Sequence, residues 1–434
     1  MLKKFLMLTA LILGLTACGK EEEPVNGVTT LKLATFEGNR QLREQVLLFN
    51  ETHEDYQIEI VEYKRSYDPQ EDGVAKLQRE IISGEGPDII DFGTSFTTSD
   101  IVGEYTENLL PYLEQESELE LFDNILETFY YEDKLYVLPV SFRLSSYAGD
   151  KDVLEQRTKW NITEMMECYL KNADSRILYP GEMKGVVFGG ILYGSSNYYI
   201  DWEKGSCRFD GEEFRQVLEF SNMFPDTLNI DMDYSVKQTI EDGETLLYHA
   251  SISDIYDICN MEFLFDGNET YIGYPVEGNS GTMAESCGCM LGISFSSKHK
   301  EMAWEFIAGF LKEDYQKQID WGLPINKTAL LGMLEENKEI EYELSEEGQE
   351  VPVVKGQLRF EGEEPVDFYY ISQEQGNKLL ELIEGVEFCN ATNTQLHFIL
   401  LEEANAYFAG DKTVEEAMEA MQSRATIFVS ERVK

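Results

Sequence analysis

The order of hydrophobic patterns between residues 30 and 63 restricts the fold more than any other feature of this chain. Residues 30–36 alternate apolar and polar side chains, which is typical of a strand. Residues 42–50 repeat apolar side chains at helical spacing, and residues 57–63 alternate again. A strand, a helix and a second strand in this order form a βαβ unit, in which the strands are parallel and the crossover is right-handed. The sequence therefore predicts an α/β fold.

The rest of the chain continues with mixed strand and helix signals. A helix at 74–83 ends before the glycines and proline of residues 84–87, and a short apolar strand follows at 88–92. A further strand is predicted at 133–140, and the acidic run at 335–350 indicates a solvated excursion or loop. Amphipathic helices are predicted at 163–171, 211–224, 303–311, 379–383, 396–407 and 414–424.

The N-terminus has the composition of a secretory signal. Lys3 and Lys4 precede an apolar run at 5–15 that is too short to span a bilayer, and small residues follow it. Because Leu-Thr-Ala leads directly into Cys18, the segment resembles a bacterial lipoprotein signal, in which the Cys becomes the lipid-bearing first residue. An ordinary signal peptide with a chance Cys is the alternative. We expect a signal peptide at 1–17, a flexible tether at 18–27, and lipid anchoring on the extracellular face of the cell membrane.

Acidic residues dominate the charge of the chain. Its 434 residues include 82 acidic and 35 basic ones, which gives a formal net charge of −47. Such a surface repels nucleic acid, since binding to phosphates requires Lys and Arg to displace counterions. It equally opposes docking on anionic lipid through a basic patch. We therefore expect no nucleic-acid partner, and contact with the membrane through lipid on Cys18.

The positions of cysteine and histidine argue against a metal or a cofactor. Six cysteines follow Cys18, and Cys287 and Cys289 are too close together for an easy disulfide. The four histidines are scattered along the chain, so no ligand set for zinc or haem is apparent. We expect no metal, no cofactor, and cysteines that are mostly buried thiols.

Motifs of one protein family follow one another along almost the whole chain. The most specific are LGISFSSKHKEMAWEFIAGFL at 291–311 and GLPINKTAL at 322–330. The others are LKLATF at 31–36, LQREIISGEGPDIIDFG at 77–93, YYEDKLYVLPVSF at 130–142, EDGETLLY at 241–248, YIGYPVEGNSG at 271–281 and EEANAYFAGDKTVEEAMEAMQSR at 402–424. In this order they resemble the extracellular solute-binding proteins of ABC importers, and most closely the sugar-binding lipoproteins related to maltose-binding protein. Residues 172–206 fit only loosely, which leaves the identity of the sugar open.

The resemblance implies a two-lobed periplasmic-binding-protein fold, an α/β architecture whose hinge-linked lobes close on a ligand in the cleft between them. We expect lobe one at 28–142 and 291–330, and lobe two at 143–290 and 331–434. The resemblance also implies a monomer that captures a solute, preferentially a mono- or oligosaccharide, and delivers it to the permease subunits of an ABC transporter. This role requires no catalytic residues, so we do not expect an enzyme.

Candidate ligand-binding residues follow from the resemblance and from the rule that ligands of open α/β sheets lie beyond the carboxyl ends of strands. Polar side chains offer hydrogen bonds to sugar hydroxyls, and aromatic rings pack against the apolar face of a sugar. Arg143 faces either the ligand, in which case an acidic sugar would fit, or a carboxylate in an interlobe salt bridge. The full set is Glu37, Asn39, Thr94, Ser95, Ser141, Arg143, Tyr199, Ser253, Asp254, Tyr274 and His397.

Other functions stay open at the level of sequence. The same cleft would serve a non-sugar solute such as a polyamine, for which the surplus of acidic residues provides carboxylates. It would also serve a sensor that reports ligand occupancy to a membrane kinase. A surface glycosidase would need two carboxylates roughly 5–10 Å apart. The sequence contains neither a Gly-x-Ser-x-Gly nor a His-Glu-x-x-His motif, so hydrolase chemistry of these two types has no support.

Overall fold

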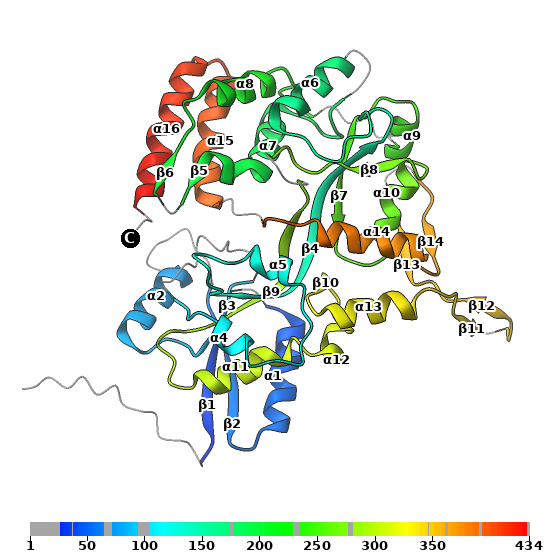
Figure 1. Ribbon diagram of the computed structural model, residues 1–434. Helices are drawn as coiled ribbons and strands as arrows, with labels where there is room; N and C mark the ends of the chain where they lie inside the picture. The colour runs from blue at the N-terminus through cyan, green and yellow to red at the C-terminus, as the bar shows by residue number, and fades with distance from the viewer. Residues whose placement is uncertain are drawn as a thin grey trace, which may run out of the picture.

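The computed structural model describes residues 27–36, 38–64, 72–93, 105–173, 177–202, 204–228, 235–276, 281–345, 347–360, 363–389 and 393–431. Its ribbon consists of two bodies, one above the other in Figure 1, connected by long strands. Apolar side chains gather in two main clusters. One includes Leu31, Ile90 and Ile307, and the other includes Trp160, Phe188 and Leu400.

The βαβ unit predicted at the start of the chain is confirmed. β1 (Thr29–Thr35) and β2 (Tyr56–Glu62) are parallel neighbours, and α1 (Arg40–Thr52) connects them. β3 (Ile89–Asp91) pairs with β1, again in parallel. The helical spacing in the sequence corresponds to a buried face of α1 that packs on the sheet. This face consists of Leu42, Val46 and Phe49.

Two long strands pass from one body into the other. β4 (Leu138–Asp150) pairs along its first half with β9 (Met283–Ile293), and along its second half with β7 (Leu247–Ile252) and β8 (Glu269–Tyr271). The sheet has the order β10-β4-β9-β3-β1-β2, in which β10 is Leu323–Pro324. One sheet therefore runs through both bodies, and β4 and β9 connect them at a crossing that we call the hinge (Figure 1).

Helices surround the sheet in both bodies (Figure 1). The lower body contains α2 (Gly73–Ser83), α4 (Leu110–Leu113), α11 (Lys300–Gly309), α12 (Glu313–Gln316) and α13 (Lys327–Glu336). The upper body contains α6 (Ile162–Asn172), α7 (Lys184–Tyr199), α8 (Glu212–Ser221), α9 (Val236–Glu241), α10 (Ile258–Leu264), α15 (Thr394–Phe408) and α16 (Val414–Ser430). α5 (Asp123–Glu127) and α14 (Gln373–Glu384) lie near the junction. Short antiparallel pairs are β5 (Ile200–Asp201) with β6 (Ser206–Cys207), β11 (Tyr342–Leu344) with β12 (Glu350–Pro352), and β13 (Gly356–Leu358) with β14 (Val366–Phe368).

The strand predicted at 133–140 begins later than expected. Residues 131–134 form a tight turn, in which Glu132 and Asp133 adopt φ angles of 49° and 59°. Positive φ is incompatible with an extended strand, so β4 starts only at Leu138. Leu135 and Val137 precede it and are buried. Their burial explains why the apolar pattern begins before the strand.

The acidic run at 335–350 is a hairpin and not a simple loop. It begins within α13 and continues as β11, which pairs with β12. The prediction that this segment is solvated is confirmed, because all three residues of β11 are exposed. Of the two predicted forms, an excursion or a loop, the structure shows a solvated excursion, because Tyr342 and Leu344 alternate with Glu343 in a short strand.

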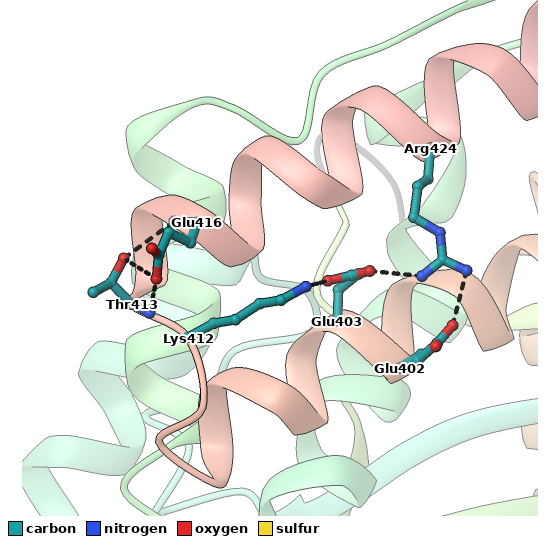
Figure 2. Close-up of polar contacts among 6 residues, drawn as sticks. All are labelled: Glu402, Glu403, Lys412, Thr413, Glu416 and Arg424. Carbon is teal, nitrogen blue, oxygen red and sulfur yellow. Dashed lines mark hydrogen bonds and ion pairs between the residues drawn. The ribbon is translucent and has the colours of Figure 1, made fainter.

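Ion pairs join α15 to the helix that follows it (Figure 2). Glu403 on α15 lies between Lys412 and Arg424, which reach it from opposite sides. Nη1 of Arg424 donates to Glu403 at 2.6 Å, and Nη2 donates to Glu402 at 2.8 Å. The Glu403 side chain is 8% exposed, so its charge is covered on all sides. We call Glu403, Lys412 and Arg424 the helix-pair cluster.

Candidate functional site

The alternation of β4 builds one side of the hinge. Successive side chains of a strand point to opposite faces. Phe142 and Leu144 point into the core, where both are fully buried. The opposite face carries Ser141, Arg143, Ser145 and Tyr147, which we call the polar row. This strand therefore has one apolar face in the core and one face of polar and aromatic side chains, of which Arg143 is exposed and the other three are buried.

Neighbouring strands widen the polar row into a surface. Glu285 on β9 lies directly opposite Arg143, and His249 on β7 lies directly opposite Tyr147. Side chains that lie opposite each other on antiparallel strands share one face of the sheet. The polar row thus belongs to a surface built by three strands around the hinge.

An ion pair lies at the centre of this surface. Nε of Arg143 donates to Oε2 of Glu285 at 2.5 Å, and the hydroxyl of Tyr193 on α7 donates to Oε1. The side chain of Glu285 is 8% exposed, whereas that of Arg143 is 45% exposed. Burial opposes the charge of Arg143, but Glu285 beside it raises the pKa of Arg143 above its ordinary value. The guanidinium therefore stays charged and reaches solvent, while the carboxylate is covered.

Aromatic side chains surround a cavity of about 540 Å³ next to Tyr193. Tyr147 and Tyr179 stack with ring centres 5.6 Å apart, and Tyr274 lies 4.9 Å from Tyr147. Of the described residues that line the cavity, none is Asp, Glu, Lys or Arg. They are Tyr147, Tyr179, Pro180, Val186, Gly189, Gly190, Tyr193, Tyr248, His249 and His397. We call this cavity the aromatic pocket.

Hydrogen bonds hold His249 in the wall of the aromatic pocket. Its Nε2 lies 2.9 Å from Oγ of Ser145 and 3.1 Å from the hydroxyl of Tyr274, and these two hydroxyls lie 3.0 Å apart. Burial lowers the pKa of His249; Glu285 opposes this shift and Arg143 adds to it. Burial also lowers the pKa of His397. Both imidazoles are therefore neutral at pH 7, and each offers one donor and one acceptor nitrogen.

Glycines allow α7 to approach the wall of the aromatic pocket. A Cβ atom at Gly194 would lie 2.3 Å from Cβ of Tyr274, well inside van der Waals contact. A Cβ atom at Gly190 would lie 3.1 Å from the hydroxyl of Tyr147. The glycine-rich sequence of this helix is thus required for close packing against the tyrosines.

The polar row ends at the lower body beside an exposed tryptophan. Oγ of Ser141 lies 2.6 Å from the carbonyl oxygen of Cys287 and 2.8 Å from that of Trp321, and donates to one of them at a time. Trp321 is 70% exposed, the largest exposed fraction of any tryptophan in the described chain. Its ring provides an aromatic plane at the hinge, and the sequence pattern alone does not show whether Trp321 belongs to the core or to a ligand-binding surface.

The structure brings four of the predicted ligand-binding residues to this surface. Ser141 and Arg143 belong to the polar row, Tyr274 is bonded to Ser145, and His397 lines the aromatic pocket. A fifth residue, Asn39, caps α1 by accepting from the N–H of Leu42, and its amide donates to Sγ of Cys289 at 3.3 Å. The ligand-binding roles of these residues stay predictions.

Other predicted residues lie elsewhere. Tyr199 is 2% exposed and packs against Phe209 and Phe214, with ring centres 5.7 Å and 5.2 Å away. It borders a second cavity of about 730 Å³, whose lining differs from the aromatic pocket because it contains four carboxylate residues. These are Glu127, Glu132, Asp201 and Glu387.

Ser253 and Asp254 form a turn before α10. Oγ of Ser253 donates to Asp257 at 3.2 Å, and the carboxylate of Asp254 accepts from the N–H of Tyr256 at 2.8 Å. Neither residue lines the aromatic pocket. Cys18, Glu37, Thr94 and Ser95 lie outside the described residues.

Several residues of this surface have no local sequence signal that selects them. Tyr147 is the exception, because the alternation of SFRLSSY at 141–147 places it on the same face as Arg143. The others become neighbours only through strand pairing and helix packing. They are Tyr179, Tyr193, His249 and Glu285.

The cysteines after Cys18 are thiols, and most of them are buried, as the sequence predicts. Only Cys207 is half-buried. Among the described residues, no group of three or more His, Cys, Asp or Glu side chains is placed to hold a metal ion. Within the same part of the chain, no helix is both long and apolar enough to cross a bilayer.

Comparison with known proteins identifies the family and the fold. The sequence model of the family described as bacterial extracellular solute-binding protein matches residues 46–339. The structure is similar to the sugar-binding protein MalE from the phytopathogen Xanthomonas citri, with a TM-score of 0.57 and 14% identity over 93% of this chain and 98% of that one. It is also similar to an ABC substrate-binding protein from Listeria monocytogenes in complex with cycloalternan, with a TM-score of 0.53 and 14% identity over 94% and 100% of the two chains.

A de novo designed cysteine esterase, ECH19, shares the fold as well. Its TM-score is 0.57 at 14% identity, over 94% of this chain and 100% of that one. Such low identities show the fold alone, which is the predicted two-lobed periplasmic-binding-protein fold with α/β lobes. No curated protein sequence matches the chain.

Proposed function

We propose, from the premise that the chain belongs to the bacterial extracellular solute-binding proteins, that it captures a carbohydrate between its lobes and delivers it to the permease of an ABC transporter. The observation that carries this proposal is the aromatic pocket beside the polar row. A sugar ring has an apolar C–H face that packs on aromatic rings, and hydroxyls that bond to a few polar groups. Four tyrosines and two neutral histidines provide both kinds of contact.

The charge of the site supports a sugar over a polyamine. A polyamine would require several carboxylates in the cleft, but the described lining of the aromatic pocket contains none. Glu285 is the carboxylate next to it, and its oxygens already accept from Arg143 and Tyr193. The acidic surplus of the chain therefore lies away from the aromatic pocket.

We further propose that the polar row and Trp321 form the floor of the cleft, and that the lobes close over it by bending at β4 and β9. Lobe one would comprise 28–142 and 291–330, and lobe two 143–290 and 331–434. In this arrangement a ligand contacts residues of both lobes and stabilises the closed form. The proposed ligand-binding residues of lobe one are Glu37, Asn39, Thr94 and Ser95, and those of the hinge and lobe two are Ser141, Arg143, Tyr199, Ser253, Asp254, Tyr274 and His397.

The proposal also includes the site of action. Lipid on Cys18 would anchor a monomer to the extracellular face of the cell membrane through the tether at 18–27. Two or more acyl chains anchor a protein stably, whereas one binds only reversibly. Replacing Cys18 with Ser should release the protein into the culture medium; a variant that stays with the membrane fraction would contradict lipid anchoring.

Binding provides the direct test of the carbohydrate proposal. Thermal denaturation of the chain from residue 28, with mono- and oligosaccharides, uronic acids and polyamines, should show a dose-dependent rise in melting temperature with one class of sugar. A ligand at a hundred times its dissociation constant adds about 2.7 kcal/mol of stability. A rise with polyamines alone would overturn the choice of ligand but leave the family intact.

A matched pair of variants tests whether the aromatic pocket is the site. His397→Ala removes a polar group from the lining and should weaken sugar binding by about tenfold, the effect of one hydrogen bond of about 1.4 kcal/mol. Phe398→Ala on the same helix is the control, since Phe398 is 62% exposed and does not line the aromatic pocket. Equal losses in both variants would contradict the assignment of the site.

A further inference from the structure

The positive charge of Arg143 is compensated within the cleft. Its Nε atom donates to Oε2 of Glu285 at 2.5 Å, and the two residues lie directly opposite each other on β4 and β9. Among the described residues, no other acidic side chain forms an ion pair with Arg143. The pair therefore contributes no net charge to the surface that the ligand would meet.

The two partners differ in how far they reach that surface. Glu285 is 8% exposed and is held from the second side by the hydroxyl of Tyr193, which lines the aromatic pocket. Arg143 is 45% exposed, and its two η nitrogens have no hydrogen bond within the described chain. A ligand on this surface would meet N–H donors, while the carboxylate that cancels their charge lies beneath them.

This arrangement distinguishes neutral from acidic solutes. A sugar hydroxyl can accept from an η N–H group of Arg143 without disturbing the ion pair. A ligand carboxylate must instead compete with Glu285 for the same guanidinium, lose its own hydration, and approach a second negative charge. The aromatic pocket offers such a ligand no other cation, because its described lining contains no Lys or Arg.

We propose that Glu285 determines the charge selectivity of the receptor: by neutralising Arg143 it admits neutral saccharides and rejects hexuronates. This inference rests on the proposed carbohydrate function and makes its ligand class narrower. Of the two roles of Arg143 that the sequence leaves open, the structure shows a salt bridge, although both partners lie within the proposed lobe two. The present proposal adds that the guanidinium faces the ligand as well.

Matched pairs of sugars measure this selectivity. Binding of glucose and glucuronate, galactose and galacturonate, and the corresponding disaccharides to the purified full chain gives a ratio of dissociation constants, acidic over neutral, for each pair. The wild-type ratio should exceed ten. In Glu285→Gln the ratio should fall by tenfold to a hundredfold, the range of one charge-assisted hydrogen bond.

Three further variants isolate the cause. Glu285→Gln should strengthen hexuronate binding because it leaves the charge of Arg143 uncompensated. The double variant Arg143→Gln with Glu285→Gln should lose this gain, because the guanidinium is then absent. Arg143→Gln alone leaves Glu285 without its cation and should raise the ratio above the wild-type value. Glu415 on α16 forms an ion pair with Arg215 on α8. Glu415→Gln removes this one negative charge and should leave the ratio unchanged.

Each result bears on one of the two proposals. A wild-type protein that binds hexuronates as well as neutral sugars overturns the role of Glu285, as does an unchanged ratio in both Glu285→Gln and Arg143→Gln. An equal fall of the ratio in Glu415→Gln assigns the effect to overall charge and also overturns it. If no saccharide of either kind binds wild type or variants, the carbohydrate proposal itself fails, and this inference with it.

Discussion

Two buried carboxylates show how the same side chain serves two purposes in one molecule. Glu285 at the hinge and Glu403 in the helix-pair cluster are each 8% exposed, and in each both oxygens accept hydrogen bonds. Glu403 accepts from two cations, Lys412 and Arg424 (Figure 2). Glu285 accepts from one cation and from the neutral hydroxyl of Tyr193.

The difference lies in what the partners of each carboxylate can do next. Arg424 is bound a second time by Glu402, so the helix-pair cluster uses its donors internally. Arg143 has no second carboxylate among the described residues, and its side chain is 45% exposed. The carboxylate of the helix-pair cluster joins two helices through two cations, whereas Glu285 has a single, half-exposed cation, which in our proposal faces the ligand.

The largest effect on stability should follow loss of the helix-pair carboxylate. Glu403→Gln leaves Lys412 and Arg424 without their common partner and should cost about 3 kcal/mol of unfolding free energy, the low end for a broken buried pair. The low end applies because the two cations are 34% and 38% exposed and regain some hydration. Urea denaturation at pH 7 measures the loss. Glu402→Gln is the control, and should cost less than about 1 kcal/mol because Glu402 is 69% exposed.

Loss of the hinge carboxylate should cost less. Glu285→Gln removes one ion pair whose cation is 45% exposed, so we expect about 1.5 kcal/mol in the same urea experiment. The main consequence should instead appear in ligand selectivity. If Glu285→Gln destabilises the fold as much as Glu403→Gln does, the contrast between a structural and a ligand-facing carboxylate is lost.

The N-terminal cap of α16 allows the stability of that helix to be measured separately from the ion pairs of the helix-pair cluster. The N–H of Glu416 donates to Oγ1 of Thr413 at 3.2 Å, and the N–H of Thr413 donates to the Glu416 carboxylate at 2.9 Å (Figure 2). Thr413→Ala should cost about 1 kcal/mol in urea denaturation. Thr413→Ser keeps the hydroxyl and should restore most of that loss; a full loss in both variants would assign the effect to packing.

The smallest expected effect is a difference in pH dependence. The folded pKa of His249 lies below its ordinary 6.5, so as pH falls below 6.5 the unfolded chain binds the proton first and stability is lost until the folded pKa is passed. Burial alone would raise the pKa of Glu403, but Lys412 and Arg424 hold it below its ordinary 4.5. The contribution of Glu403 to the free energy of unfolding is therefore complete above pH 4.5, and it is lost as pH falls through the folded pKa.

Urea denaturation across pH separates these two windows. The difference between wild type and His249→Gln should begin to change near pH 6.5, and by less than about 1 kcal/mol. The difference between wild type and Glu403→Gln should stay constant to about pH 4.5 and narrow only below it. Identical profiles for both differences would show that the two regions do not titrate separately.

Local patterns were sufficient to predict much of the fold. The βαβ unit at 30–63 and the amphipathic helices near the C-terminus carry their period in the sequence. Buried side chains occur at every second position in the first half of β1 and on one face of α1 and of α16. α7 gave no such signal, since apolar residues and glycines occur on all sides of it. A helix that packs against tyrosines on one side and against α15 on another has no polar face to reveal its period.

The site was less predictable than the fold for a related reason. Arg143 could be selected from its place after the predicted strand, but its partner Glu285 lies 142 residues away along the chain. Only the pairing of β4 with β9 makes them neighbours. Tyr199 illustrates the opposite case, because an aromatic cluster in sequence suits a ligand surface and a core equally well, and here it packs with Phe209 and Phe214.

The alternation of β4 from Ser141 to Tyr147 confines evolutionary change in this part of the hinge to substitution. A one-residue insertion or deletion within the strand would exchange its two faces and drive Arg143 into the core position of Phe142. Lineages that acquire a new ligand must therefore replace side chains at every second position of β4 and keep its length. Among descendants of this protein, the polar row can diversify while the intervening apolar residues and the spacing between them persist.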